Sequence, residues 1–333
     1  MTNFKALRIH KSGTCIQSRF DVIGLADLTP GDVVIRVAYS CVNYKDALAV
    51  TGKGAITRGS PRTAGIDLSG IVETSTHPLF KAGDKVLVTG SNIGESVDGG
   101  LAEFARVPGE VVVPLPQGLT LVESMALGTA GFTAAIALRR LLDNHQTPGH
   151  GPIAVTGPTG GVGGIALGLL KRTGFSTVAI TGKSDSATYL QELGADEVID
   201  RTTLDMGSKP LEKAIWGGAI DNLGGTMLTY LTRTVRPWGN IACIGLAESP
   251  VLNTTVMPLI LRAVSLLGIN SVEVPSSWRQ LIWQKLSGDW KPNNISRSLI
   301  REVISLEDVP RACNELVAGL AKGRYVVRIG GDL

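Results

Sequence analysis

The sequence predicts an α/β protein with two domains, one built on a doubly wound parallel sheet and the other rich in β-strands. Residues 153–244 alternate short apolar runs with helix-like segments, which is typical of a parallel sheet covered on both faces. Residues 4–123 instead show short β-rich segments separated by Gly and Pro. At 333 residues, with 44% hydrophobic and 18% charged residues, the chain is long enough to bury two cores.

The β-rich domain is expected to be a twisted, barrel-like arrangement of strands. Its predicted strands cover residues 5–10, 32–40, 66–74, 85–89 and 101–108. Residues 123–142 are rich in Ala and Leu at helical spacing, and the polar linker 144–152 then leads into the second domain.

The second domain alternates strand and helix in the order that a parallel sheet requires. Strands are predicted at 153–156, 177–181, 197–200, 219–222, 240–244 and 264–269, and helices at 161–173, 185–193, 210–215 and 226–235. After a helix at 278–286, residues 300–329 predict a strand, a helix at 306–321 and a final strand. Because the parallel sheet is complete by then, this tail is expected to return to the first domain. The predicted domains are therefore 1–123 with 294–333, and 124–293.

A glycine-rich turn joins the first parallel strand to its helix, in the stretch Ile-Ala-Val-Thr-Gly-Pro-Thr-Gly-Gly-Val-Gly-Gly at 153–164. Glycines allow a sharp turn and let the backbone approach a pyrophosphate at the positive end of the helix, as in the Rossmann fold. An ordinary helix start is the alternative, but the order of strand, turn, helix and second strand favours dinucleotide binding. The residues expected to hold the pyrophosphate are Gly157, Thr159, Gly160, Gly161, Val162 and Gly163.

The end of the second parallel strand indicates which dinucleotide binds. An NAD enzyme usually has an Asp or Glu there to hold the ribose 2′-hydroxyl. Here the residues are Thr181, Gly182, Lys183 and Ser184, and Arg201 follows the next strand. Two cations and hydroxyl groups suit a 2′-phosphate, so we expect NADPH, with Lys183 and Arg201 converging on its phosphate. Two solvated charges at loop tips are the alternative.

Further cofactor contacts are expected beyond the carboxyl ends of later strands, where ligands bind in such sheets. Asn222, Gly245 and Leu246 are placed there by the pattern, and their backbone groups would hold the ribose or the carboxamide. By the same reasoning, Asn270 and Ser271 are expected to face the nicotinamide.

Composition excludes several other classes of protein. The net charge of +3 is small and the Lys and Arg residues are scattered, so nucleic acid is not an expected partner. The four cysteines are far apart, which argues against a disulfide framework or a structural zinc site. The first residues lack the apolar region of a signal peptide, and no apolar run is expected to span a membrane. A soluble cytoplasmic protein is the expectation.

Several motifs give the chain a resemblance to a known family. It resembles the medium-chain dehydrogenases/reductases, in the zinc-independent quinone oxidoreductase branch, and most closely the acrylyl-CoA reductase subgroup. The motifs are Cys-Val-Asn-Tyr-Lys-Asp at 41–46, Gly-Ile-Asp-Leu-Ser-Gly at 65–70, Gly-Thr-Ala-Gly-Phe-Thr-Ala at 128–134, the 156–163 loop, and Thr-Val-Met-Pro-Leu-Ile-Leu-Arg at 255–262. The resemblance implies that the β-rich part is a GroES-like catalytic domain.

The chain departs from the zinc alcohol dehydrogenases at the positions of the metal ligands. Asn43 stands where those enzymes have a ligand Cys, and Gly65-Ile66-Asp67 stands where they have Gly-His-Glu. Neither Asn43 nor Ile66 can supply a thiolate or imidazole, and the four histidines have no ligand spacing. We therefore expect no metal. The remaining plausible chemistry is hydride addition to an already polarised double bond.

Such a reaction places negative charge on a carbonyl oxygen, and preordered donors are the usual way to stabilise it. The resemblance would bring Asn43, Tyr44, Lys45 and Thr129 near the nicotinamide. Tyr44 is the first candidate for contact with the cofactor or for protonating the α-carbon, with solvent as the other proton source. Arg324 resembles a basic residue of the family that reaches a phosphate.

Each of these assignments has a structural alternative. Tyr44 is equally compatible with a core position. Lys45 and Asp46 could form a local ion pair, and Thr129 could serve packing alone. Asp67 is expected to brace its loop rather than act as a base, and Arg324 could be an exposed arginine without a role.

The predicted function is an NADPH-dependent reductase of α,β-unsaturated thioesters, converting acrylyl-CoA to propionyl-CoA. The alternatives are a reductase of quinones or enones, and a protein that binds NADPH as a redox sensor without turnover. Residues 264–269, at the end of the sheet, could pair with a second copy, as the resemblance implies, so a homodimer is expected. A helix-covered edge in a monomer is the alternative.

Overall fold

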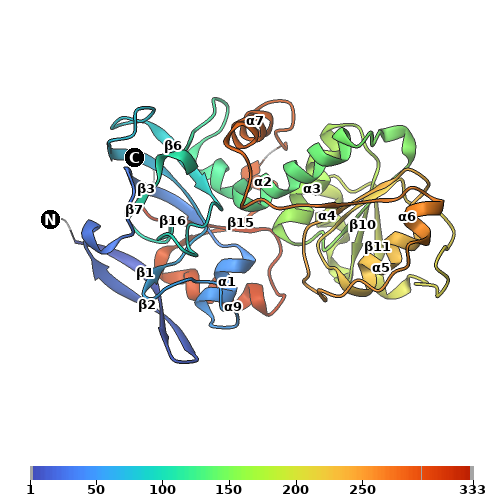
Figure 1. The fold of residues 1–333 in the computed structure, drawn as a ribbon, viewed down its shortest axis with the longest axis horizontal. Coiled ribbons are helices and arrows are strands. Elements are labelled where there is room, and N and C mark those ends of the chain that lie inside the picture. Colours follow the sequence, from blue (N-terminus) through green and yellow to red (C-terminus); the bar gives the residue numbers. More distant parts are fainter. Residues whose placement is uncertain (1–2, 294, 331–333) are drawn as a thin grey trace. The chain divides into compact units, whose positions relative to one another are not determined.

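The computed structural model of the chain describes residues 3–293 and 295–330, with the side chain of Ser184 left out. These residues divide into two compact units (Figure 1). Unit 1 comprises Met1–Thr129, Ser271–Ser287 and Ile295–Leu333, and unit 2 comprises Ala130–Asn270 and Gly288–Asn294.

Unit 1 is built from two sheets. A three-stranded sheet has the order β2-β1-β4, and a larger one has the order β15-β16-β3-β5-β6-β8, with β7 paired to β3. The strands are β1 Phe4–Ser12, β2 Cys15–Ile23, β3 Val33–Cys41, β4 Arg62–Thr63, β5 Asp67–Ser75, β6 Lys85–Thr89, β7 Phe104–Val107, β8 Val113–Pro114, β15 Ile300–Ser305 and β16 Arg324–Arg328. The late strand β16 pairs with the early strand β3, so the tail does return to the first unit.

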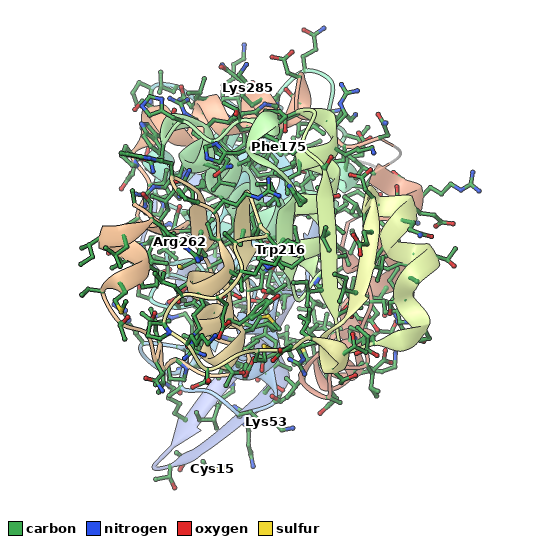
Figure 2. The ribbon with its side chains drawn as sticks, turned by 90° about the vertical axis from the view of Figure 1, so that its right-hand side faces the viewer. Cys15, Lys53, Phe175, Trp216, Arg262 and Lys285 are labelled. Atoms are coloured by element: carbon green, nitrogen blue, oxygen red, sulfur yellow. The ribbon has the colours of Figure 1, made fainter. Side chains whose placement is uncertain are left out.

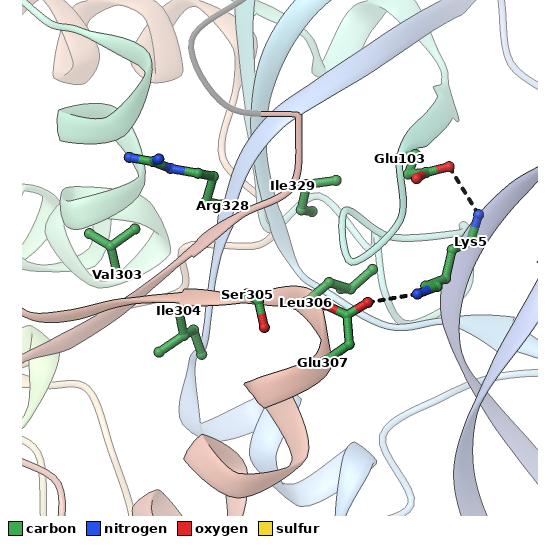
Figure 3. Close-up of a pocket in the computed structure, with 9 residues that line it drawn as sticks. All are labelled: Lys5, Glu103, Val303, Ile304, Ser305, Leu306, Glu307, Arg328 and Ile329. Atoms are coloured by element: carbon green, nitrogen blue, oxygen red, sulfur yellow. Dashed lines mark hydrogen bonds and ion pairs between the residues drawn. The ribbon is translucent and has the colours of Figure 1, made fainter.

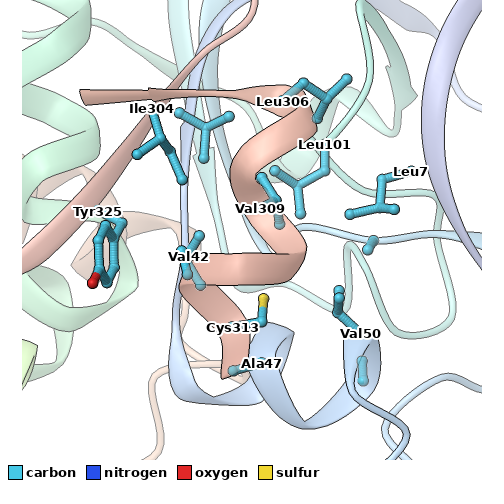
Figure 4. Packing of buried hydrophobic residues seen from close by; sticks show 14 of the residues in the cluster. Leu7, Val42, Ala47, Val50, Leu101, Ile304, Leu306, Val309, Cys313 and Tyr325 are labelled. Carbon is cyan, nitrogen blue, oxygen red and sulfur yellow. The ribbon is translucent and has the colours of Figure 1, made fainter. Parts of the chain in front are cut away.

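The helices of unit 1 are short. They are α1 Tyr44–Val50, α7 Ser276–Ser287, α8 Ile295–Ser298 and α9 Val309–Val317, with 3₁₀ turns at Leu25–Asp27, Gly109–Val111 and Leu306–Asp308. Helix α9 packs on α1, and Val309 and Cys313 are buried against Ala47 and Val50 (Figure 4). This apolar cluster anchors the helix that begins at Tyr44.

Unit 2 carries a six-stranded parallel sheet with the order β11-β10-β9-β12-β13-β14. The strands are β9 Ile153–Thr156, β10 Thr177–Thr181, β11 Glu197–Asp200, β12 Gly218–Asp221, β13 Asn240–Cys243 and β14 Ser265–Gly268. In chain order this is 3-2-1-4-5-6, the Rossmann order, with its switch point between β9 and β12. All residues of β9 and β10 are buried, as expected for strands covered on both faces.

The helices of unit 2 flank this sheet (Figure 1). They are α3 Gly161–Arg172, α4 Ala187–Leu193, α5 Gly225–Thr234 and α6 Met257–Leu261, with 3₁₀ turns at Pro148–His150, Ser184–Ser186 and Arg201–Thr203. Trp216, labelled in Figure 2, is buried in a core formed by residues of β9, β10, β12 and α5. Cys15, also labelled there, lies exposed at the end of the β1–β2 hairpin.

Helix α2, Leu121–Asp143, contributes to both units and is broken at Gly128, where φ is 51° and ψ is −155°. By length and composition it could cross a membrane, so the expectation that no apolar run is long enough was wrong for this segment. Yet 83% of its most apolar window is buried inside the protein, which is typical of a core helix.

Two other expectations differ from the structure. The helix predicted at 210–215 was wrong, because the backbone there bonds to the end of α5: Glu212 N–H donates to Arg233 O and Ile215 N–H donates to Thr234 O. Residues 124–129 and 271–287 were assigned to the second domain, whereas the structure packs them in unit 1. The buried guanidinium of Arg279 holds the latter segment, donating to Thr89 O at 2.8 Å.

Candidate active site

The glycine-rich turn of unit 2 is shaped by close backbone approach. Gly157 has φ of +57°, in the left-handed region that favours glycine. A Cβ at Gly163 would lie 2.6 Å from Gly157 O, so only glycine fits there. At Gly160 a Cβ would meet only Gly157 O, at 3.4 Å, which leaves open space on its outer side. The turn is therefore tight inside and open outside, as a phosphate cradle requires.

The start of α3 is suited to an anion. Its N-cap is Gly160, and no described side chain caps the first turn. The first N–H groups of a helix lack partners within the helix and carry its positive end. These groups belong to Gly161, Val162 and Gly163, so the predicted residues of the loop fit a pyrophosphate. Thr159, also predicted, is almost buried beside them.

The two cations predicted to bind a 2′-phosphate follow neighbouring strands. Thr181 of β10 pairs with Asp200 of β11, so Lys183 and Arg201 leave the sheet at adjacent places. The guanidinium of Arg201 lies 3.5 Å from where a Cβ on Gly182 would be. The Asp200 carboxylate accepts from Thr202 N–H and hydroxyl, so it is committed to its own turn. The side chain of the predicted Ser184 lies outside the described residues.

Glu248 is a carboxylate near this basic group that the sequence reasoning missed. One of its oxygens is 3.9 Å from Arg201 Nη1, and the other accepts from Thr226 N–H at 3.2 Å. Because that separation is long and Arg201 is part-exposed, the ion pair holds the guanidinium only loosely.

The switch point between β9 and β12 is held by a polar cluster. The Asn222 side-chain amide donates to Thr156 O at 2.8 Å, and Thr156 hydroxyl donates to buried Asp221 at 2.7 Å. Burial raises the pKa of Asp221. A Cβ on Gly245 would lie 2.3 Å from Asn222 O, so the Gly245 backbone packs directly on this cluster, while Leu246 is exposed. Sequence reasoning found Asn222 and Gly245 but missed Asp221 and Thr156.

In unit 1 the predicted residues Asn43 and Thr129 meet at the buried carboxylate of Asp67. Asp67 Oδ2 accepts from Asn43 Nδ2 at 2.8 Å and from Thr129 N–H at 2.8 Å, and Oδ1 accepts from Thr129 hydroxyl at 2.5 Å. The hydrogens that were expected to stabilise an oxyanion are thus directed at Asp67. We therefore no longer assign Asn43 and Thr129 as oxyanion donors. The expectation that Asp67 braces its loop agrees with this geometry.

Tyr44 differs from Asn43 and Thr129 because it is half exposed, with 50% of its surface accessible. It is the first residue of α1, directly after the N-cap Asn43. The alternative of a core tyrosine is therefore wrong. Its position leaves it available to a ligand.

Lys45 and Asp46 do not form the local ion pair considered as an alternative. Lys45 Nζ instead pairs with Glu95 at 2.7 Å. Asp46 is buried and accepts from the N–H groups of Asn43 and Ile66, both at 2.9 Å. Its burial raises its pKa to about 7.

Arg324 does not lie at the surface of unit 1, as a phosphate ligand would. Only 4% of it is accessible, and its guanidinium donates to Cys41 Sγ at 3.0 Å, Ala126 O and Val42 O. Because the Arg324 guanidinium forms its hydrogen bonds inside the unit, the assignment of Arg324 to a phosphate is withdrawn.

Ser271 is only partly buried, and its carbonyl accepts from Arg279 Nη2 at 3.5 Å. Asn270, the last residue before it, belongs to unit 2 and is exposed.

No group of three or more His, Cys, Asp or Glu side chains in the described residues is arranged to hold a metal ion. Asn43, which stands where zinc alcohol dehydrogenases have a ligand Cys, donates a hydrogen bond to Asp67, which stands at the Glu of their Gly-His-Glu motif. A cavity of about 480 Å³ elsewhere in unit 1 is lined by none of the predicted residues; Lys5 crosses it to Glu307 (Figure 3).

Two protein families match the chain, one mainly in each unit, although the second match includes residues 271–287, which the structure packs in unit 1. Residues 29–117 match the family described as "Alcohol dehydrogenase GroES-like domain", and residues 161–287 match the family described as "Zinc-binding dehydrogenase". A β-rich GroES-like unit combined with a Rossmann unit defines the class of protein as a two-domain oxidoreductase.

Individual relatives refine the class. The chain is 44% identical to "Putative quinone oxidoreductase YhfP" of Bacillus subtilis, over 98% of this chain and 99% of that protein. It is 40% identical to "Acrylyl-CoA reductase AcuI" of Ruegeria pomeroyi, over 94% of each. The chain therefore belongs to the medium-chain dehydrogenases/reductases, in the zinc-independent quinone oxidoreductase branch, as the motifs predicted.

Solved structures of similar proteins contain nucleotides. The structure of Escherichia coli K-12 YhdH with bound NADPH has a TM-score of 0.93 and 41% identity, over 97% of this chain and 99% of that one. The structure of Bacillus subtilis YhfP with bound NAD has a TM-score of 0.94 and 42% identity, over 98% of this chain and all of that one. Dinucleotides thus bind proteins of this fold in both phosphorylated and unphosphorylated forms.

Proposed function

We propose that the protein is an NADPH-dependent reductase of α,β-unsaturated thioesters, with acrylyl-CoA as substrate and propionyl-CoA as product. The single observation that carries the proposal is the fit of unit 2 to a phosphorylated dinucleotide: an uncapped helix start behind an open glycine turn, with Arg201 beside Gly182. The similarity to the acrylyl-CoA reductase AcuI supports the choice of substrate.

In this proposal unit 2 holds the cofactor. The N–H groups of Gly161, Val162 and Gly163 bind the pyrophosphate, and Lys183 and Arg201 bind the 2′-phosphate. Backbone groups near Asn222 and Gly245 line the nicotinamide end. Bound NADPH supplies a hydride, which bonds to the β-carbon while the π electrons of the C=C bond move toward the carbonyl oxygen.

Unit 1 supplies the groups that act on the substrate. Tyr44, exposed at the start of α1, is the proposed contact of the reacting thioester and the proposed proton donor to its α-carbon. Asn43 and Thr129 hold this region in place through Asp67.

The test is oxidation of NADPH, followed by absorbance, with acrylyl-CoA, crotonyl-CoA and a quinone. We expect the largest kcat/KM with acrylyl-CoA and formation of propionyl-CoA. A larger value with the quinone would instead establish the quinone reductase, which the similarity to YhfP favours. Tight NADPH binding without turnover of any of the three would favour the redox sensor.

We also propose that the protein is a cytoplasmic homodimer. The Rossmann sheet ends at β14, and one side of this strand has no strand partner among the described residues. Exposed large apolar side chains gather in the segment that precedes it: Trp238, Leu246, Val251, Leu252, Val256, Met257, Ile260 and Leu261. Such a surface beside an open sheet edge suits pairing with a second copy. The free thiols Cys15, Cys41, Cys243 and Cys313 suit a reducing compartment.

A matched pair of substitutions tests the dimer. Ile260→Glu should raise the dimer dissociation constant at least about 10-fold, because it buries a charge in the proposed interface. Val22→Glu changes an equally exposed side chain of unit 1 and should have no such effect, since Ile260 is 71% and Val22 72% accessible. Sedimentation velocity over a range of concentrations measures both. A monomeric wild-type protein would refute the homodimer.

A further inference from the structure

Asp67 belongs to a buried polar core that joins segments distant in the sequence. Its Oδ2 accepts from Cys41 Sγ at 3.1 Å, and the same sulfur accepts from Arg324 Nη2 at 3.0 Å. Asp67, Cys41 and Arg324 are all almost fully buried. We call these three residues the polar core. It connects the end of β3, the start of β5 and the start of β16.

The directions of the two hydrogen bonds made by the Cys41 thiol are defined in this arrangement. Burial, followed by the negative charge of Asp67, raises the pKa of Cys41 well above its ordinary value, so the sulfur keeps its proton. It can therefore donate to the carboxylate while it accepts from the guanidinium. A buried cation and a buried anion are thereby linked through a neutral group, which lowers the cost of burying each.

Gly128 shows how closely helix α2 is fitted to the polar core. A Cβ at this position would lie 2.5 Å from Asp67 Oδ2, 2.9 Å from Cys41 Sγ and 3.0 Å from Arg324 Nη2. The break of α2 at Gly128 frees the carbonyl of Ala126, which accepts from Arg324, and the N–H of Thr129, which donates to Asp67. The helix thus restarts at Thr129 in contact with the carboxylate.

The same carboxylate holds the start of α1. Asn43 Nδ2 donates to Asp67 Oδ2, and Asn43 is the N-cap of the helix whose first residue is Tyr44. One side chain thus fixes two segments that are 62 and 24 residues away in sequence from Asp67. Each segment carries a residue predicted for the site, Thr129 in one and Tyr44 in the other.

We propose that Asp67, held by Cys41 and Arg324, is a positioning residue that sets the half-exposed Tyr44 for the reaction. The inference rests on the proposed reductase function. Asp67 touches neither reactant in this proposal and acts through Asn43 and the start of α1. Since displacement of a reacting group by about 1 Å can cost about 100-fold in rate, a change at Asp67 should lower kcat by roughly that factor. NADPH affinity, which depends on unit 2, should change less than about twofold.

A double-mutant cycle with Asp67→Asn and Tyr44→Phe separates positioning from general structural support. Tyr44 is exposed and has no hydrogen bond to Asp67, so the two changes should add in their effect on Tm. In kcat they should not add: Tyr44→Phe should cost roughly 100-fold in the wild type, as much as Asp67→Asn does, and less than about twofold in Asp67→Asn. Additive losses in kcat, or no loss in Tyr44→Phe, would overturn the proposal.

Cys41 offers a gentler change should Asp67→Asn not fold. Cys41→Ser keeps a donor and an acceptor and should retain kcat within about threefold, whereas Cys41→Ala breaks the link and should lose about 10-fold. Val72 is the control, because it is a buried side chain of unit 1 in a separate apolar cluster that contains no residue of α1. Val72→Ala should lower Tm and leave kcat unchanged. Equal kcat losses in both alanine variants would refute the positioning role.

A structural measurement keeps this inference separate from the proposed function. The amide of Thr129 should be protected from hydrogen exchange in the wild type and in Cys41→Ser, and should exchange at least about 10-fold faster in Cys41→Ala. If the wild type reduces none of the three substrates, the proposed function fails, and this exchange still shows whether the polar core holds Thr129. Unchanged exchange in Cys41→Ala would show that it does not.

Discussion

The two units build their candidate sites in opposite ways. Unit 2 offers mostly backbone: a glycine turn, the uncapped start of α3 and part-exposed cations at strand ends. Unit 1 offers mostly buried side chains, gathered around Asp67 from three other segments, at residues 41–43, 129 and 324. A backbone site depends on local conformation and tolerates changes outside the turn. A side-chain core depends on every member, because an unpaired buried polar group costs free energy.

The largest effect is expected at Asp46, where unit 1 buries a carboxyl group. Its pKa is raised from 3.8 to about 7 mainly by burial, so between these values the folded state keeps a proton that the unfolded state has lost. The free energy of unfolding should therefore fall as pH rises from about 4 to about 7, by an upper limit of roughly 4 kcal/mol. Asp46→Asn should flatten this dependence.

Urea unfolding of wild type and Asp46→Asn at several pH values measures the difference in slope. Because a common contribution from other groups cancels between the two proteins, only the difference matters. Parallel pH curves for the two would mean that Asp46 does not keep its proton, and the contrast between a buried unit 1 site and an open unit 2 site would weaken.

The next effect concerns the backbone cradle of unit 2. A Cβ at Gly163 would lie 2.6 Å from Gly157 O, so Gly163→Ala must displace the turn. NADPH affinity should fall at least about 100-fold, or about 2.8 kcal/mol. Binding is measured by isothermal titration calorimetry.

Gly168→Ala is the control for Gly163→Ala. Both glycines lie in α3, but a Cβ at Gly168 meets its nearest neighbour at an ordinary 3.5 Å. Gly168→Ala should keep full affinity and stabilise the fold by roughly 0.5–1 kcal/mol, because Ala favours a helix interior. Similar affinity losses for both variants would mean that the shape of the turn is not what binds the pyrophosphate.

The smallest effect is expected from Lys183 and Arg201, the part-exposed cations of unit 2. Lys183→Glu and Arg201→Ala should each weaken NADPH binding by about 10- to 100-fold and NADH binding by less than about threefold, since each cation makes one charge-assisted contact with the 2′-phosphate. Lys171→Ala, at an exposed lysine of the same unit that pairs with Asp196, should change neither affinity. Equal losses for NADPH and NADH would refute the phosphate clamp.

The sequence allowed the strands and helices of unit 2 to be predicted with two clear errors: a helix was predicted at 210–215, and the short helix α6 at Met257–Leu261 was missed. The 210–215 segment contains helix-forming residues, but tertiary hydrogen bonds to the end of α5 keep it extended. In unit 1 the strand β2 and the helix α1 were missed. Strand β2 is mostly polar and part-exposed, and α1 spans only Tyr44–Val50, so neither shows a strong periodic pattern.

In the candidate site, too, the features with a local sequence pattern were predicted and those without one were missed. Its glycine loop and basic residues are contiguous in the chain or follow adjacent strands, so a motif and the order of a parallel sheet locate them. Asn43, Thr129 and Arg324 were noticed in the sequence, but their partners were not, because a hydrogen bond between residues 24 or 62 positions apart leaves no local pattern.

What the sequence alone determined is therefore the family, the Rossmann order of strands and the glycine turn proposed to bind the cofactor, since each depends on local propensity, periodicity or a short motif. Only the tertiary structure decided that Arg324 is buried, that Asn43 and Thr129 direct their hydrogens at Asp67, and that Tyr44 remains exposed. The physical reason is that burial and pairing are properties of side chains brought together by the whole fold, and neighbouring residues along the chain do not encode them.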